Sequence, residues 1–146
     1  MKSRTKARVA ALQVLFELDL TQHPMGEVLE ARSIDNGLNE SQREFALGLI
    51  NGVRDNYQIL DELISVHAPE WPLDQIAVID RNILRLALWE VAFYGKTPLK
   101  VGINEAVELG KLFGSDASPR FINGVLGSLA ERIPEISKEY GKTGKS

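Results

Sequence analysis

The sequence contains no cysteine and only two histidines among its 146 residues. Without cysteine the chain has no disulfide bond and no thiolate chemistry, which suits a reducing compartment such as the cytoplasm. His23 and His67 lie far apart with no ligand-like spacing around them, so no metal site is predicted. No run of about 18 apolar residues is present, so no membrane-spanning helix is expected. Gln13, Glu17 and Asp19 interrupt the first apolar run before it could serve as a signal peptide.

The sequence also lacks the alternation of apolar and polar residues that is typical of β-strands. Its apolar residues recur at helical spacing instead, and 44% hydrophobic and 25% charged residues are ordinary values for a globular protein. The pattern predicts an all-α fold, a compact bundle of about seven helices in one domain over residues 1–134. The polar residues 135–146 are expected to form a solvated tail.

The first half of the chain predicts three or four helices. An apolar stripe in the first helix comprises Val9, Leu12, Phe16 and Leu20. Pro24 and Gly26 are expected to end that helix, and a short, weak helix is expected around 27–32. Ser41 stands three residues before Glu44, which predicts a capping box at the start of the next helix. A further apolar face is formed by Ile59, Leu60, Leu63 and Ile64.

The second half predicts the longest helix, over 73–94, which is apolar on most sides as a central buried helix would be. An amphipathic helix over 99–113 is expected to end at Gly114 as its C-cap. Ser118 is expected to cap the last helix, with Pro119 at its first position.

Positive charge is concentrated at the N-terminus although the net charge is −3. The segment MKSRTKAR holds Lys2, Arg4, Lys6 and Arg8 and no acid. Cations at a helix start face the positive end of the helix dipole, which is unfavourable by roughly 0.3–1 kcal/mol each. Two interpretations stay open: a frayed, solvated leader, or a basic arm that binds phosphates and becomes ordered on binding.

The segment SPRFINGVLG, residues 118–127, combines a core stripe with residues that suit a polyanion. Arg120 brings charge to a helix start whose free N–H groups already favour anions. Phe121 could pack inward or stack on an unpaired base, and Asn123 could read a base edge or bond to a nearby loop. Gly124 and Gly127 are expected to permit close helix packing.

The segment DRNILRLALWE places charges within a mostly apolar helix. Arg81 and Arg85 repel each other slightly unless acidic residues on other helices form ion pairs with them. Glu105 and Glu108 are candidates for these ion pairs. Internal ion pairing and an interaction surface are both open here. No nucleophile–histidine motif, Walker A loop or dinucleotide fingerprint is present. The sequence therefore predicts a protein that is not an enzyme and needs no cofactor.

Three segments in this order and spacing, RNILRLALWEV, INEAVELGKLFG and SPRFINGVLG, resemble the NusB family of bacterial transcription antitermination factors. RTKARVAALQVLFELDL is similar to that family's basic first helix. The likeness runs from about Arg4 to Ile133 and is weakest between Gly26 and Glu40. It implies two small helical subdomains, a cytoplasmic protein, and binding to single-stranded boxA RNA together with ribosomal protein NusE. It also implies a complex with other Nus factors and RNA polymerase that suppresses termination, notably on ribosomal RNA operons.

The resemblance also implies which residues make these contacts. The implied RNA-binding residues are Arg4, Lys6, Arg8, Arg120, Phe121 and Asn123, with Arg85 and Lys100 as further candidates. Glu90 matches a position associated with the NusE-facing surface. Thr5 interrupts a run that is often denser in arginine, and Gly127 stands where some members carry an acid.

Two other functions compete with this one. The accessory RNA-binding domain of ribosomal RNA methyltransferases resembles NusB, but those chains continue into a domain with catalytic cysteines, so that reading would require this chain to be a fragment. A protein-binding helical adaptor, for example a homodimer, is the second alternative. Salt-dependent RNA affinity would separate the adaptor from the other two.

Overall fold

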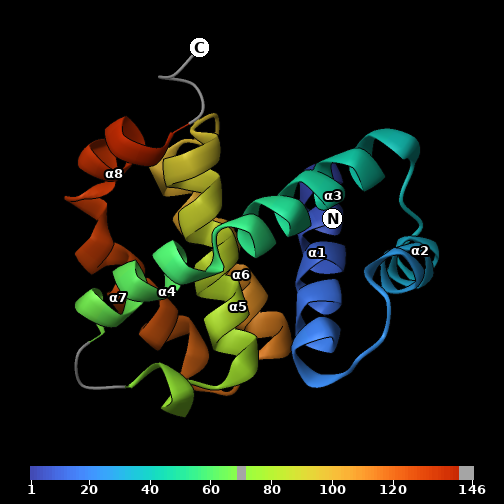
Figure 1. Cartoon of the computed structure of the whole chain (residues 1–146), viewed down its shortest axis with the longest axis horizontal. Helices are drawn as coiled ribbons and strands as arrows, with labels where there is room; N and C mark the ends of the chain where they lie inside the picture. Colours follow the sequence, from blue (N-terminus) through green and yellow to red (C-terminus); the bar gives the residue numbers. More distant parts are fainter. Residues whose placement is uncertain (69–71, 142–146) are drawn as a thin grey trace. The chain divides into compact units, whose positions relative to one another are not determined.

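The computed structural model describes residues 1–68 and 72–141, and these residues form helices, with no strand among them (Figure 1). The all-α prediction is therefore confirmed. The chain falls into two units, Met1–Asp55 and Asn56–Ser146, in line with the two subdomains that the resemblance implied. The first unit holds α1 (Ser3–Leu20), α2 (Met25–Asp35) and α3 (Glu40–Asp55). The second holds α4 (Tyr57–His67), the 3-10 turn η1 (Leu73–Gln75), α5 (Val78–Leu88), the π-helical η2 (Trp89–Tyr94), α6 (Leu99–Phe113), α7 (Ser118–Ala130) and α8 (Ile133–Tyr140).

Helix α1 packs against α2 and α3, but its buried face differs from the predicted stripe. Val9 and Leu12 are buried as expected, whereas Phe16 and Leu20 are exposed. The buried face is wider and includes Ala7, Ala11, Val14 and Leu15. These positions follow the i, i+4, i+7, i+8 pattern of a helix face, and the small alanines on it lower its apolar signal in the sequence.

The boundaries between α1, α2 and α3 also differ from the predicted ones. Helix α1 ends at Leu20, while Pro24 is the N-cap of α2 and Gly26 lies inside α2. The predicted weak helix is thus longer, from Met25 to Asp35.

The capping box of α3 lies two residues before the predicted pair of Ser41 and Glu44. The Asn39 backbone N–H donates to Gln42 Oε1 at 2.9 Å, and the Gln42 N–H donates to Asn39 Oδ1 at 2.8 Å. This is the reciprocal arrangement of a capping box with an asparagine as its first member.

The predicted long helix over 73–94 is divided. Leu73–Gln75 form η1, Ile76 is extended, and α5 begins only at Val78. Helix α5 continues directly into η2, which ends at Gly95 in the left-handed conformation (φ 75°) that glycine adopts without strain. Every residue from 82 to 93 is buried, as predicted, but α1 with 18 residues is longer than α5 with 11.

Helices α6 and α7 form a closely packed antiparallel pair in the second unit (Figure 1). Gly114 is the C-cap of α6, as predicted, and its N–H donates to the Gly110 carbonyl at 2.9 Å. The N-cap of α7 is Ala117 rather than Ser118. The Ser118 hydroxyl instead accepts the Ser115 N–H at 2.9 Å and so fixes the loop between the two helices.

Residues 135–140 do not form the solvated tail that their composition suggested. They belong to α8, in which Ile133 and Ile136 are buried. The ring of Tyr140 stacks on Phe93 with centroids 5.2 Å apart, and the Ser137 hydroxyl donates to the Ala92 carbonyl at 2.8 Å. The remainder of the predicted tail, residues 142–146, lies outside the described residues. Among the described helices none is long and apolar enough to cross a membrane.

Candidate nucleic-acid interface

The residues implied to bind RNA lie in both units. Arg4, Lys6 and Arg8 stand in the first two turns of α1. Those of the second unit are Arg85 in α5, Lys100 in α6 and Arg120, Phe121 and Asn123 in α7.

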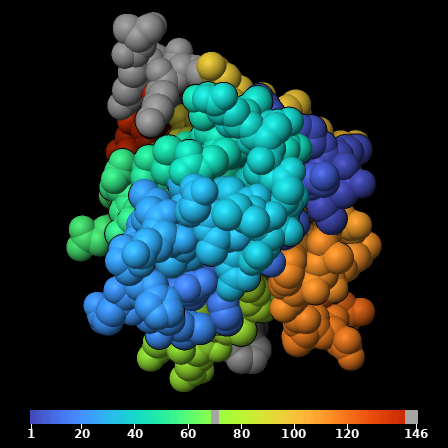
Figure 2. Space-filling view, turned by 90° about the vertical axis from the view of Figure 1, so that its right-hand side faces the viewer, coloured from blue at the N-terminus to red at the C-terminus, as the bar shows by residue number. Residues whose placement is uncertain are grey.

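The basic start of α1 is helical from Ser3 and is attached to α3. Gln42 Nε2 donates to the Ser3 carbonyl at 3.0 Å and lies 3.1 Å from the Ser3 hydroxyl. The Arg4 guanidinium lies 4.4 Å from the centre of the Phe45 ring. Figure 2 shows the dark-blue start of α1 directly beside the teal surface of α3. These contacts do not fit a frayed leader over residues 3–8, and they hold the first turn in place before any ligand binds.

The three α1 cations differ in accessibility. Arg4 is exposed and Lys6 is half-buried, while Arg8 is only 7% exposed and lies 5.5 Å from the Phe45 ring centre. The first turn of α1 contains no acid. Arg4 and Lys6 are therefore the accessible cations of this group, and the Arg8 side chain belongs to the packing between α1 and α3.

The start of α7 presents one buried and one exposed face. Ile122, Val125 and Leu126 are buried, as the periodicity predicts. Arg120 and Asn123 are exposed, and Phe121 is half-buried. The chain thus places a cation, an amide and a partly accessible ring within one turn of helix.

Gly124 and Gly127 do not permit close helix packing, contrary to expectation. Both are exposed, and an added Cβ at either position would meet nothing within 4 Å. A glycine that does lie close to another helix is Gly110 of α6, where an added Cβ would be 2.9 Å from Ile122 Cδ1 of α7. Beyond Asn123, the exposed face of α7 therefore has no side chain at positions 124 and 127.

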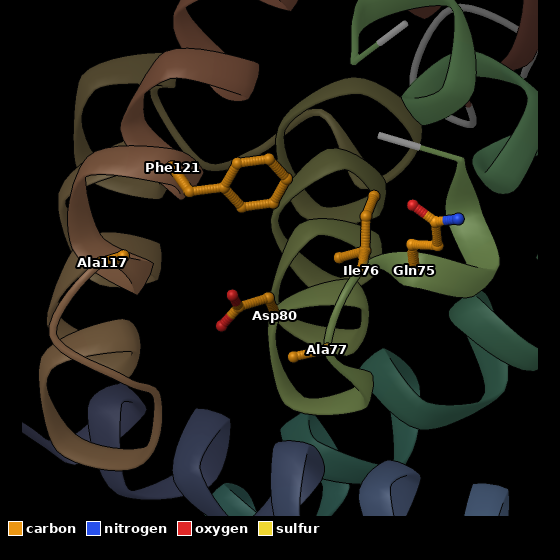
Figure 3. Close-up of a pocket in the computed structure, with 6 residues that line it drawn as sticks. All are labelled: Gln75, Ile76, Ala77, Asp80, Ala117 and Phe121. Carbon is orange, nitrogen blue, oxygen red and sulfur yellow. The ribbon is translucent and has the colours of Figure 1, made fainter. Parts of the chain in front are cut away.

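A cavity of about 180 Å³ lies in the second unit beside Phe121 (Figure 3). Its lining residues are Gln75, Ile76, Ala77, Asp80, Ala117 and Phe121. Sequence reasoning did not assign a role to Asp80. The available signal was an acid at the start of a mostly apolar helix, which is too common to single out a site.

Arg85 is not on the surface. It is 6% exposed, and its Nε and Nη2 donate to the two carboxylate oxygens of Asp61 at 2.7 and 2.9 Å. Its Nη1 donates to Asn82 Oδ1 at 3.1 Å, and its guanidinium lies 4.6 Å from the Tyr57 ring centre. Internal ion pairing therefore describes Arg85 better than an RNA contact does. The acid on another helix is Asp61 of α4, whereas Glu108 pairs with Lys111 on α6.

Lys100 is exposed in the first turn of α6, where it is accessible to a ligand. Glu90 is 3% exposed, and its Oε2 accepts a hydrogen bond from the Thr97 hydroxyl at 2.6 Å. A carboxylate buried in this way does not fit direct contact with a partner protein. The hydrogen bond instead joins η2 to the loop that precedes α6.

The described residues contain no group of three or more His, Asp or Glu side chains that could hold a metal ion. What the second unit offers at the start of α7 is a charged, partly aromatic surface beside a small cavity. Such a surface suits binding of an anionic, ring-containing ligand better than bond-making chemistry.

Comparison with known proteins identifies the relatives of this chain. The NusB family model matches residues 5–131. A transcription antitermination protein NusB from Chloroflexus aggregans is 46% identical over 131 residues, which cover 88% of this chain and 87% of that protein.

Solved structures agree with this match. NusB from T. maritima is 31% identical with a TM-score of 0.79, covering 97% of this chain and 95% of the other. A crystal structure of antitermination factors NusB and NusE in complex with dsRNA is 26% identical with a TM-score of 0.78, covering 96% and 99%. The chain therefore belongs to the NusB family of transcription antitermination proteins.

Proposed function

We propose that this protein acts in transcription antitermination by binding RNA together with a NusE protein. The observation that carries the proposal is the start of α7, where the exposed side chains of Arg120 and Asn123 and the half-buried ring of Phe121 lie within one turn of helix. The described relative that binds both NusE and RNA supports it. Such a factor works in the cytoplasm, beside RNA polymerase and other Nus factors.

At the start of α7, each of the three side chains is proposed to contact a different part of the RNA. Arg120 supplies positive charge for a phosphate, and the first N–H groups of the helix reinforce it. The accessible part of the Phe121 ring offers a stacking face to an unpaired base, worth roughly 1–3 kcal/mol. Asn123 follows on the exposed face and can donate to and accept from a base edge.

In α1, Arg4 and Lys6 are proposed to contact phosphates, and Lys100 on α6 is proposed as a further contact. Arg8 and Arg85 are given supporting roles, because their guanidinium groups lie against Phe45 and Asp61 respectively. For Glu90 the proposed role is also indirect: its bond to Thr97 holds the loop before α6 in place for the partner protein.

The form of the RNA is part of the proposal. The related NusB–NusE complex contains dsRNA, whereas stacking on Phe121 requires a base that is free of its pair. We therefore expect a single-stranded element such as boxA to bind more tightly than a duplex of the same sequence.

The decisive experiment measures RNA affinity with and without NusE for the wild-type chain and for Phe121→Ala and Arg120→Ala. Phe121→Ala is expected to weaken binding by roughly 1–3 kcal/mol with little dependence on salt, because stacking releases no counterions. Arg120→Ala is expected to weaken binding in a way that fades at high salt. Since Phe121 is half-buried, the urea midpoint is measured on the same samples.

A loss of folding stability without a loss of affinity in the folded fraction would assign Phe121 to the core alone. RNA binding that is absent with and without NusE would favour the adaptor function. The accessory-domain alternative is less well supported, because the relatives identified by comparison, such as the one from Chloroflexus aggregans, are transcription antitermination proteins.

A further inference from the structure

The cavity beside Phe121 has mostly apolar walls, the polar side chain of Gln75 at its edge and one buried acidic group. Ile76 and Ala77 line it from the segment before α5, and Ala117 and Phe121 line it from α7. Figure 3 shows the Phe121 ring and the Asp80 carboxylate reaching from the two helices into the space between them. A ligand in this space would meet a ring on one side and a carboxylate on the other.

Asp80 is the unusual member of this lining. It is 7% exposed, and its Oδ1 is buried without a hydrogen-bond partner among the described residues. The neighbouring Arg81 makes no hydrogen bond to that oxygen, and its Nη2 donates to the Ile76 carbonyl at 3.0 Å. A buried acceptor of this kind is unfavourable unless a donor meets it.

The position of Asp80 in the helix does not account for this geometry. An acid in the first turn of α5 is favoured by the helix dipole. An acidic side chain that points into solvent would interact with the helix dipole equally well, so the dipole does not explain why Asp80 is buried. The carboxylate at this position instead faces a cavity large enough to hold a donor.

The size of the cavity limits the ligand. A cavity of about 150 Å³ lined by apolar side chains can hold a benzene molecule. The volume of about 180 Å³ here therefore suits a single six-membered ring with small substituents. A purine, with two fused rings, would extend beyond this volume and contact the walls with only part of its surface.

We propose that this cavity binds one unpaired cytosine of the RNA, with the ring against Phe121 and its N4 amino group donating to the Asp80 carboxylate. The inference rests on the proposed RNA-binding function and adds a base preference to it. Carboxylates accept hydrogen bonds from cytosine N4. Uracil presents the O4 acceptor at the same place and would repel the carboxylate.

The test uses single-stranded oligonucleotides of about ten nucleotides, all uracil or with one central cytosine or adenine. The wild-type chain, with NusE present, is expected to bind the cytosine oligonucleotide roughly fivefold more tightly than the all-uracil one. Asp80→Asn is expected to abolish or reverse this ratio, because an amide can donate to uracil O4. Asp74→Asn removes the same charge from an exposed residue of η1 and is expected to leave the ratio unchanged.

A second variant keeps the acid and removes the space. Ala117→Leu places a larger side chain in the cavity wall and is expected to lower the cytosine preference while the salt dependence of binding stays as in the wild type. Urea midpoints show whether either variant is folded.

The outcomes separate this inference from the proposed function. Salt-dependent RNA binding with equal affinity for uracil and cytosine, or a ratio that Asp80→Asn leaves intact, overturns the inference and leaves RNA binding in place. Tighter binding of the adenine oligonucleotide overturns the choice of a single-ring base. A complete lack of RNA binding in the wild type overturns both.

Discussion

At the scale of single residues, Arg85 combines a two-point ion pair, a hydrogen bond to Asn82 and a contact with the Tyr57 ring. A guanidinium buried to this degree has lost most of its hydration, so each of its contacts compensates for lost water. The same contacts leave it little freedom to meet a phosphate. Its importance is therefore expected in folding.

Arg85→Ala is expected to lower the free energy of unfolding by about 3–5 kcal/mol, because Asp61 then keeps a poorly solvated charge without its partner. Urea denaturation measures this loss, and RNA affinity is measured on the folded fraction. The exposed Lys100→Ala serves as the control and should hardly change stability. If Arg85→Ala left the stability unchanged and weakened RNA affinity, Arg85 would instead be assigned a direct contact with RNA.

His67 predicts a pH dependence of stability. Burial, and secondly the positive charge of Arg132, lowers the pKa of His67 from its usual 6.5. Its Nδ1 lies 3.1 Å from the Ser128 hydroxyl, and its Nε2 is buried without a partner among the described residues. Protonation would therefore place a charged N–H where no acceptor meets it.

Because the folded state binds the proton less readily than the unfolded state, stability is fully present above pH 6.5 and is lost as the pH falls below it. The free energy of unfolding is expected to fall more between about pH 7.5 and about pH 5 in the wild type than in His67→Gln. Glutamine can still bond to Ser128 and does not titrate. Parallel pH profiles for the two proteins would contradict this role.

At the scale of elements, the glycines of α6 and α7 have opposite surroundings. A Cβ at Gly102 would collide with Val91 of η2, whereas a Cβ at Gly124 or Gly127 would meet open space. Gly102→Ala is expected to destabilise the protein by about 1–3 kcal/mol, as overpacked cores do. Gly124→Ala and Gly127→Ala are each expected to stabilise it by about 0.5–1 kcal/mol.

Thermal or urea unfolding of the three variants measures these differences. RNA affinity adds a second result, because a methyl group on the exposed face of α7 would weaken binding if RNA approaches the helix backbone there. Stabilisation with unchanged affinity would limit the interface to the first turn of α7. A neutral Gly102→Ala would mean that Val91 moves aside without strain.

Local chemistry explains which helix ends could be predicted from the sequence. Gly114 and Pro119 act within a few residues of themselves: Gly114 is the C-cap that the sequence predicts, and Pro119 is the second residue of α7, one position later than predicted. The capping box of α3 was misplaced because Ser41–Glu44 and Asn39–Gln42 carry the same type of signal. The helix α8 was missed because its stability depends on Phe93 and Ala92, which lie more than forty residues earlier in the chain.

In the candidate site, too, features that depend on one segment could be predicted, and contacts between distant segments could not. The two faces of α7 follow from the helical period, so Ile122 inside and Arg120 outside could be predicted. The partner of Arg85 could not, since Asp61 lies 24 residues away and no spacing rule connects them. The unpaired oxygen of Asp80 and the cavity in front of it depend on how α5 and α7 pack, which no single segment encodes.

At the scale of the whole molecule, a net charge of −3 makes RNA binding depend on locally concentrated cations. Replacing Arg4 and Lys6 by alanine together is expected to reduce the log–log salt slope of single-stranded RNA binding by about 1.4, or about 0.7 for each phosphate contact. Arg8 is left unchanged because it is buried against Phe45, and its loss would damage the fold. An unchanged slope would show that these two cations do not contact phosphates.

The last prediction concerns the coupling between RNA and NusE. If NusE strengthens RNA binding by some factor, thermodynamic linkage requires RNA to strengthen NusE binding by the same factor, typically about 5–150-fold. Calorimetry of all four binding steps measures both factors independently. Arg120→Ala should weaken RNA binding alike in the absence and presence of NusE, because the start of α7 is proposed to contact RNA and not the partner. A coupling factor of one would mean that the protein binds its two ligands independently, and the antitermination complex would then need another component to bring them together.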